Sequence, residues 1–195
     1  NYDIQYLFVY IVFMANFHLL EYLTTAMFHS DATLESFVLS HSSEYSIAFI
    51  ASISEFLVEL YLFPNMKTNP IWNFIRYIGF ALSVSGQLMR SVSMITAGSN
   101  FDHIIATEKD KSHVLVKTGV YSIFRHPSYT GFFYFSLGLQ LILFNPICFI
   151  GFFFALKKFF TSRIFFEEDT LVEFFGDEYK EYKKTSGIYI PFIGN

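Results

Sequence analysis

The thirty residues from Pro127 to Leu156, PSYTGFFYFSLGLQLILFNPICFIGFFFAL, contain no charged side chain. As one straight helix they would be about 45 Å long, well beyond the hydrocarbon core of a membrane at roughly 30 Å. Asn145-Pro146 lies near the middle of the stretch, and this dipeptide favours a turn. We therefore predict a helical hairpin, with one arm from Ser128 to Phe144 and the other from Pro146 through Phe166.

Counting residues outward from the turn predicts which side chains meet at the open end of the hairpin. Ser128 lies seventeen residues before Asn145, and Arg163 lies seventeen after Pro146, so both should reach the same depth. Glu167 is one helical turn beyond Arg163 on the same face. We expect these polar groups to converge on one site at the membrane edge. The same spacing is also typical of a simple ion pair at a helix end.

The composition is that of an integral membrane protein. Of the 195 residues, 53% are hydrophobic and 27 are phenylalanine, too many for a soluble domain of this size to bury. The net charge of −4 argues against a nucleic-acid partner, which would require a basic face. Cys148 is the single cysteine, so we predict no internal disulfide, and no spacing suggests a metal site.

Three apolar stretches, over residues 4–20, 45–63 and 71–96, precede this region, and each is long enough to span a membrane. Glu21 marks the polar end of the first. We predict an all-α fold, a polytopic membrane helix bundle with a C-terminal helical hairpin. Its transmembrane helices occupy residues 1–96, and a catalytic region with loop, hairpin and tail occupies residues 97–195.

Two polar or small-residue features lie inside these spans. Glu55 and Glu59 are four residues apart and share one helical face, where a membrane protein turns carboxylates toward protein or water. A proton relay is one interpretation of the pair, and we favour a helix-packing network or an interfacial position. Gly79 and Gly86, with Ser83 between them, form a small-residue face suited to close helix contact.

A polar loop from Ala97 to Arg125 links the spans to the hairpin, and its aliphatic residues predict a folded cap on the membrane. The loop is the most basic one in the chain, which places it in the cytosol by the positive-inside rule. Its basic residues are Lys109, Lys111, Lys117 and Arg125. The polar run from His113 to Tyr129 indicates a functional site. The alternative is an ordinary interfacial loop in which Arg125 and the tyrosines contact lipid headgroups.

Four runs occur in a fixed order: TAGSNFDH (96–103), HVLVKTGVYSIFRHPSYTGFF (113–133), LFNPIC (143–148) and EED (167–169) ahead of EFFGDEYKEYKK (173–184). Together they resemble the isoprenylcysteine carboxyl methyltransferase family, over nearly the whole chain. RHPSY alone is less specific, since related membrane methyltransferases and sterol reductases carry similar segments. The family has additional N-terminal spans, so the resemblance implies that spans precede Asn1.

The resemblance implies methyl transfer from S-adenosylmethionine to the C-terminal carboxylate of a prenylated cysteine. By match to the family's motifs, the cofactor site would be lined by His113, Val114, Leu115, Val116, Tyr121, His126, Pro127, Ser128, Tyr129 and Glu167. Arg163 would contact the substrate, and Arg163 and Glu167 would be the catalytic residues. Ala106 stands where the family commonly has glutamine, so that cofactor contact is absent or replaced.

The resemblance also implies partners and a location. The partners would be prenylated CaaX proteins, such as small GTPase-like proteins, together with membrane lipid. The location would be the endoplasmic reticulum, with a cytosolic cofactor-binding cap. Two other interpretations stay open: a membrane sterol or enone reductase using NADPH at a similar loop, and a non-enzymatic channel or receptor-like bundle. Only Glu55 and Glu59 favour the second.

Overall fold

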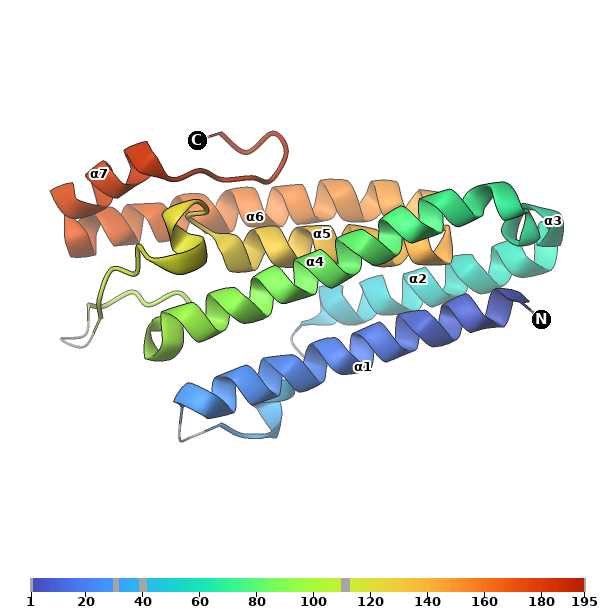
Figure 1. Ribbon diagram of the computed structural model, residues 1–195, viewed down its shortest axis with the longest axis horizontal. Helices are drawn as coiled ribbons and strands as arrows, with labels where there is room; N and C mark the ends of the chain where they lie inside the picture. The colour runs from blue at the N-terminus through green and yellow to red at the C-terminus, as the bar shows by residue number, and fades with distance from the viewer. Residues whose placement is uncertain (1, 30–31, 39–41, 110–112, 195) are drawn as a thin grey trace.

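The protein is a bundle of helices that lie side by side along one long axis (Figure 1). A computed structural model describes residues 2–29, 32–38, 42–109 and 113–194. Within these residues the regular structure is helical apart from one parallel bridge between Phe124 and Gly187, which confirms the all-α prediction. The α-helices are α1 (Tyr2–Phe28), α2 (Ser43–Leu62), α3 (Pro64–Thr68), α4 (Asn73–Ala97), α5 (Pro127–Leu143), α6 (Pro146–Phe175) and α7 (Asp177–Thr185).

The predicted hairpin is formed by α5 and α6. Each helix begins at a proline, where the missing N–H costs nothing and the fixed φ suits a first turn. Phe144 ends α5 in a left-handed conformation, with φ 54°, and so reverses the chain. The second arm is longer than predicted, because α6 continues beyond Phe166 to Phe175. It ends at Gly176, whose φ of 56° suits a glycine after a helix.

The helix α1 also extends further than predicted, and the boundary at residue 20 is wrong. The helix runs to Phe28, and Glu21 is not its polar end but a buried residue, 1% exposed. The reason is a partner from a distant part of the chain. Arg90 in α4 forms an ion pair with Glu21 at 2.6 Å, so the carboxylate can stay inside the bundle.

The helices α4 and α5 pack closely along a stripe of glycines, which confirms the predicted small-residue face. A β-carbon added to Gly86 would lie 2.5 Å from the carbonyl oxygen of Gly131, and one added to Gly79 would lie 2.7 Å from that of Gly138. Only residues without side chains allow the two backbones to approach to this distance. Because Gly131 lies one turn after Pro127, the stripe fixes the start of α5 against α4.

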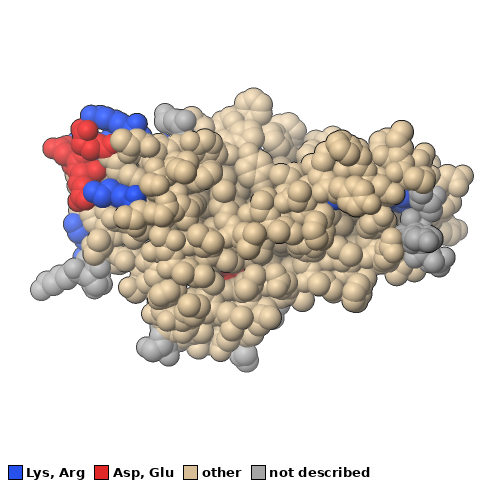
Figure 2. All heavy atoms as spheres, in the orientation of Figure 1, with Lys and Arg blue, Asp and Glu red and all other residues tan. Residues whose placement is uncertain are grey.

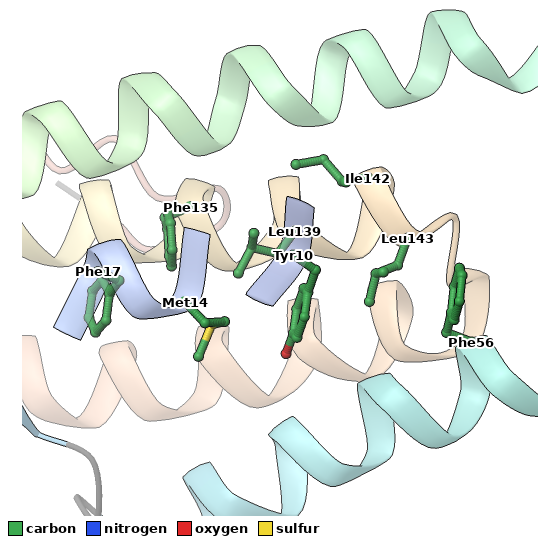
Figure 3. Packing of buried hydrophobic residues seen from close by; sticks show 8 residues of the cluster. All are labelled: Tyr10, Met14, Phe17, Phe56, Phe135, Leu139, Ile142 and Leu143. Carbon is green, nitrogen blue, oxygen red and sulfur yellow. The ribbon is translucent and has the colours of Figure 1, made fainter. Parts of the chain in front are cut away.

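The main apolar core joins α1, α2 and α5 (Figure 3). Figure 3 shows Tyr10, Met14 and Phe17 of α1 packed toward α5. Phe17 stacks on Phe135 with ring centroids 5.1 Å apart. Phe56 brings α2 to the same core, near the turn of the hairpin. The core therefore joins α5 to α1 and α2.

The outer surface is apolar along the body of the bundle. Large side chains on several helices are exposed, among them Phe8, Ile47, Phe74 and Phe154. On the face shown in Figure 2, charged residues gather at one end, where α7 and the C-terminal end of α6 lie. Two helical segments, Ile4–Phe28 and Ser43–Leu62, are long and apolar enough to cross a membrane by length and composition. The helices α4 and α5 are not among these two segments: α4 contains the charged residues Arg76 and Arg90, and α5 is 17 residues long.

Glu55 of α2 caps the first turn of α6. Its carboxylate oxygens accept hydrogen bonds from the backbone N–H groups of Ile147 at 2.7 Å and Cys148 at 2.6 Å. These donors have no partner inside the helix, and a negative charge at a helix N-terminus is favourable. A packing role for this carboxylate, the interpretation favoured from the sequence, is therefore confirmed.

Lys67 of α3 binds the free carbonyl groups at the C-terminal end of α5. It is fully buried, and its Nζ donates to the carbonyl oxygens of Leu143 at 3.0 Å and Phe144 at 2.6 Å, and to Asn145 Oδ1 at 3.1 Å. The charge is balanced by Glu59, whose Oε2 lies 2.6 Å away. The two glutamates of α2 thus fix both sides of the hairpin turn.

Candidate active site

One cavity gathers all ten residues expected at the cofactor site. It lies where the loop 97–129 meets the C-terminal end of α6 and helix α7. The expected residues that line it are His113, Val114, Leu115, Val116, Tyr121, His126, Pro127, Ser128, Tyr129 and Glu167. We call this space the first cavity. The structure brings these ten residues together around one cavity, and their contact with a cofactor stays a prediction.

His126 lines the first cavity, one residue before α5. Its ring stacks on Tyr129, with centroids 5.5 Å apart and planes 4° from parallel. Its Nε2 lies 3.3 Å from Glu168 Oε1, and its Nδ1 lies 3.6 Å from Glu167 Oε2. The imidazole therefore separates two adjacent carboxylates, one at hydrogen-bond distance and one beyond it.

Glu168 is a structural anchor and not a free ligand. Arg125 donates to its Oε1 at 2.8 Å, and Lys183 of α7 donates to its Oε2 at 2.5 Å. Burial would raise the pKa of Glu168, but the hydrogen bonds from His126, Lys183 and Arg125 outweigh it and hold this pKa below its usual range. Arg125 also donates to the carbonyls of Lys183 and Ser186, so this network holds the C-terminal segment onto the cap.

Glu167 lines the first cavity. Its Oε2 is buried and has no hydrogen-bond partner among the described residues. The hydroxyl of Tyr179, which lines the same cavity, is likewise buried without such a partner. An unsatisfied buried oxygen is costly, so both groups are suited to a polar ligand. Burial raises the pKa of Tyr179, with nearby Glu168 adding to the effect, so its hydroxyl remains a neutral donor.

Arg163 lines a second cavity, which shares Ile104 and Ile105 with the first. Its Nε donates to the hydroxyl of Tyr129 at 2.8 Å, which confirms that the two arms of the hairpin reach the same depth. Its Nη2 donates to the carbonyl oxygen of His103 at 2.5 Å. Among the described residues no ion pair joins Arg163 to Glu167, so the simple i,i+4 pair does not form. Each side chain faces a different cavity.

Several residues of the first cavity were not assigned to the site from the sequence. Phe174, Phe175 and Tyr179 from the C-terminal part of the chain line the cavity, as do Asn100 and Tyr182. Helical spacing shows which side chains share a face but not what that face covers. Ala106 also lines the cavity, at the position where glutamine was expected.

The first cavity has the chemical character that an amino-acid-bearing nucleoside requires. Glu167 offers an unpaired carboxylate oxygen to an ammonium group. Tyr121 and Phe174 supply aromatic walls for a flat base. Burial raises the pKa of Tyr121, with Glu167 contributing, so this side chain is uncharged at neutral pH. The residues present therefore fit S-adenosylmethionine.

Comparison with known proteins gives a consistent result. A family model described as the isoprenylcysteine carboxyl methyltransferase family matches residues 78–173. A protein-S-isoprenylcysteine O-methyltransferase of Dictyostelium discoideum is 45% identical over 95% of this chain and 77% of its own length. This chain belongs to the isoprenylcysteine carboxyl methyltransferase family. The human relative with the same name is 43% identical over 94% of this chain and 64% of its own length.

A solved structure supports the same family fold. It is described as the eukaryotic intramembrane Ras methyltransferase, isoprenylcysteine carboxyl methyltransferase, without a monobody. The TM-score is 0.93 at 42% identity, and the match covers 98% of this chain and 68% of that one. The chain is thus an integral membrane protein. It spans about two thirds of the length of several methyltransferase relatives, and the match favours neither the reductase nor the channel interpretation.

Proposed function

We propose that this chain transfers a methyl group from S-adenosylmethionine to the C-terminal carboxylate of a prenylated cysteine, forming a methyl ester. The observation that carries the proposal is the junction at Tyr129. This side chain lines the first cavity, and its hydroxyl accepts a hydrogen bond from Arg163, which lines the second. A methyl donor in the first cavity and a methyl acceptor in the second would therefore meet next to this side chain.

The acceptor needs no general base. A terminal carboxyl has a pKa of roughly 3.5, so it is already ionised at neutral pH. Arg163 can hold such a carboxylate through its planar donors. Because an overly tight pair would stabilise the ground state, we assign Arg163 the role of orienting the nucleophile and not of activating it. Orientation alone accelerates a displacement that requires three atoms in line.

The donor supplies the electrophile when it is bound: a methyl carbon carried by a positively charged sulfur. Glu167 would accept a hydrogen bond from the donor's ammonium group at Oε2 and offset its positive charge. His126, 3.6 Å from this oxygen, limits how far the carboxylate can turn. Together these residues would fix the amino-acid end of the donor.

The walls of both cavities contain apolar side chains, which keep water away from the reacting groups. In the second cavity they are Ile104, Ile105, Ala155, Phe159 and Phe166. An anion and a cation combine to neutral products in this reaction, so the reactants lose more solvation than the transition state does when water is excluded. The same apolar surface suits a prenyl chain that arrives sideways from lipid.

The membrane arrangement follows from the charges. The loop between α4 and α5 and the helix α7 carry many of the lysines, so we place this end in the cytosol by the positive-inside rule. Lys109 and Lys117 support this placement, and Lys111 lies outside the described residues. Family membership supports the endoplasmic reticulum as the location. It also supports prenylated CaaX proteins, such as small GTPase-like proteins, as substrates.

The proposal is tested by labelled methyl transfer in membranes that contain the full-length parent chain. N-acetyl-S-farnesylcysteine is the acceptor, and the same compound with a carboxamide in place of the carboxylate is the matched control. We expect label in the acid, released by mild base as an ester is, and none in the amide. Transfer to both compounds, or to neither in folded protein, would refute the proposal.

A further inference from the structure

A carboxylate is buried in α1 close to the site, and its position needs an explanation. Arg90 of α4 donates to both oxygens of Glu21, from Nε at 2.6 Å and from Nη2 at 2.7 Å. This bidentate contact neutralises the carboxylate and fixes its plane. The Nη1 group of Arg90 donates to Ser128 Oγ at 2.8 Å, at the wall of the first cavity.

Glu21 has a second partner, which the charge balance does not require. His103 Nε2 lies 2.8 Å from Glu21 Oε2. His103 belongs to a segment, residues 101–107, without regular secondary structure, and its ring meets Phe101 edge-on at 5.3 Å. Because Arg90 already balances the charge of Glu21, the additional hydrogen bond serves to tie this loop to a membrane helix.

The tied loop is the partition between the two cavities. Ile104 and Ile105 line both of them, and His103 lines the second. The backbone carbonyl of His103 accepts the hydrogen bond from Arg163 Nη2. His103 therefore contacts Glu21 through its ring and Arg163 through its main chain. The position of the Glu21 carboxylate thus affects the orientation of the Arg163 guanidinium.

We propose that Glu21 and His103 are positioning residues that orient Arg163 toward the carboxylate of the methyl acceptor. The inference rests on the function proposed above. The donors of a guanidinium lie in one plane, and contacts at Nε and Nη2 fix that plane, so the Nη1 edge is presented to the second cavity in one orientation. Without the tie to Glu21, the carbonyl at position 103 moves and the guanidinium loses one of its two constraints.

The test substitutes His103 and leaves the Glu21–Arg90 pair intact. His103→Phe keeps a ring against Phe101 but removes the donor, whereas His103→Gln places an amide donor at the same reach. For His103→Phe we expect the KM for N-acetyl-S-farnesylcysteine to rise about tenfold, the loss expected for one charge-assisted hydrogen bond. The KM for S-adenosylmethionine should not change, and His103→Gln should restore most of the acceptor affinity.

A neutral analogue separates positioning of Arg163 from general damage to the cavity. The carboxamide of N-acetyl-S-farnesylcysteine has no charge for Arg163 to hold, so its inhibition constant should be the same in wild type and His103→Phe. Weaker inhibition by the amide, an equal rise in both KM values, or no rescue by glutamine would overturn the inference. Absence of transfer in wild type would instead overturn the proposed function, so the two failures are distinguishable.

Discussion

Lys67→Met is expected to destabilise the protein at the end of the bundle remote from the site. Lys67 is buried where α3 meets the hairpin turn. Methionine fills a similar space but cannot donate a hydrogen bond or balance a charge. The substitution leaves Glu59, which is 9% exposed, without its partner at 2.6 Å. It also removes the donor for the last carbonyls of α5.

The magnitude follows from the type of interaction lost. Removing one member of a buried ion pair costs about 3–5 kcal/mol, chiefly because the other charge stays buried. For a chain of this length, each kcal/mol lowers the unfolding midpoint by about 2–4 °C. We therefore expect the midpoint to fall by about 10 °C. Adding Glu59→Gln to Lys67→Met should recover part of this loss, since no unpaired charge then remains.

The assay is thermal unfolding of the purified protein in detergent, with wild type and variants in the same buffer. Lys184→Met is the matched control, because the Lys184–Glu181 pair is exposed and contributes little. A midpoint for Lys67→Met within about 2 °C of wild type would contradict the role assigned to Lys67. So would a double variant with Glu59→Gln that is less stable than Lys67→Met alone.

Three further outcomes are expected. Gly131→Ala should destabilise by about 1–3 kcal/mol in thermal unfolding, because the new β-carbon meets α4 backbone, whereas Gly151→Ala, with open space around it, should stabilise slightly. Because folding lowers the pKa of Glu168 from its usual value of 4.5, its ionised carboxylate stabilises the fold above pH 4.5. The midpoint of thermal unfolding should therefore fall as the pH drops below 4.5, and Glu168→Gln should make this fall smaller. Tyr129→Phe removes the hydroxyl that accepts a hydrogen bond from Arg163, and it should raise the KM for the farnesylcysteine substrate roughly fivefold in kinetic assays.

The hairpin and the glycine stripe could be predicted because they depend on local chemistry. An uncharged stretch too long for one span must turn, and Asn145-Pro146 is the residue pair within it that favours a turn. Gly79 and Gly86 indicate close packing whatever their partner is. The end of α6 was placed too early because a charged run is compatible with either a loop or an exposed helix.

The buried polar networks could not be predicted, since each depends on a partner far away in the chain. Glu21 looks like a helix end until Arg90, 69 residues later, neutralises it. Lys67 looks like a loop lysine until the hairpin turn folds over it. A charged residue in a sequence gives no sign of its future partner, so its burial follows from the tertiary structure alone.

The site itself was predicted in two different ways. Equal residue counts from the turn to Ser128 and to Arg163 place Arg163 beside the start of α5, a geometric inference that the contact with Tyr129 confirms. The selection of His113 and its neighbours rests on resemblance to the family, and these residues do line one cavity. Spacing and resemblance select Glu167 from the sequence, but the anchoring role of Glu168 is shown only by its contacts with Arg125 and Lys183.

The central claim is that the two cavities hold the two substrates, and a comparison of Arg163→Ala with Glu167→Ala tests it most directly. Both KM values are measured for each variant by labelled methyl transfer in membranes. We expect Arg163→Ala to raise chiefly the KM for the farnesylcysteine acceptor and Glu167→Ala chiefly that for S-adenosylmethionine. Wild-type kinetics in both variants, or the opposite assignment of the two KM values, would contradict the account.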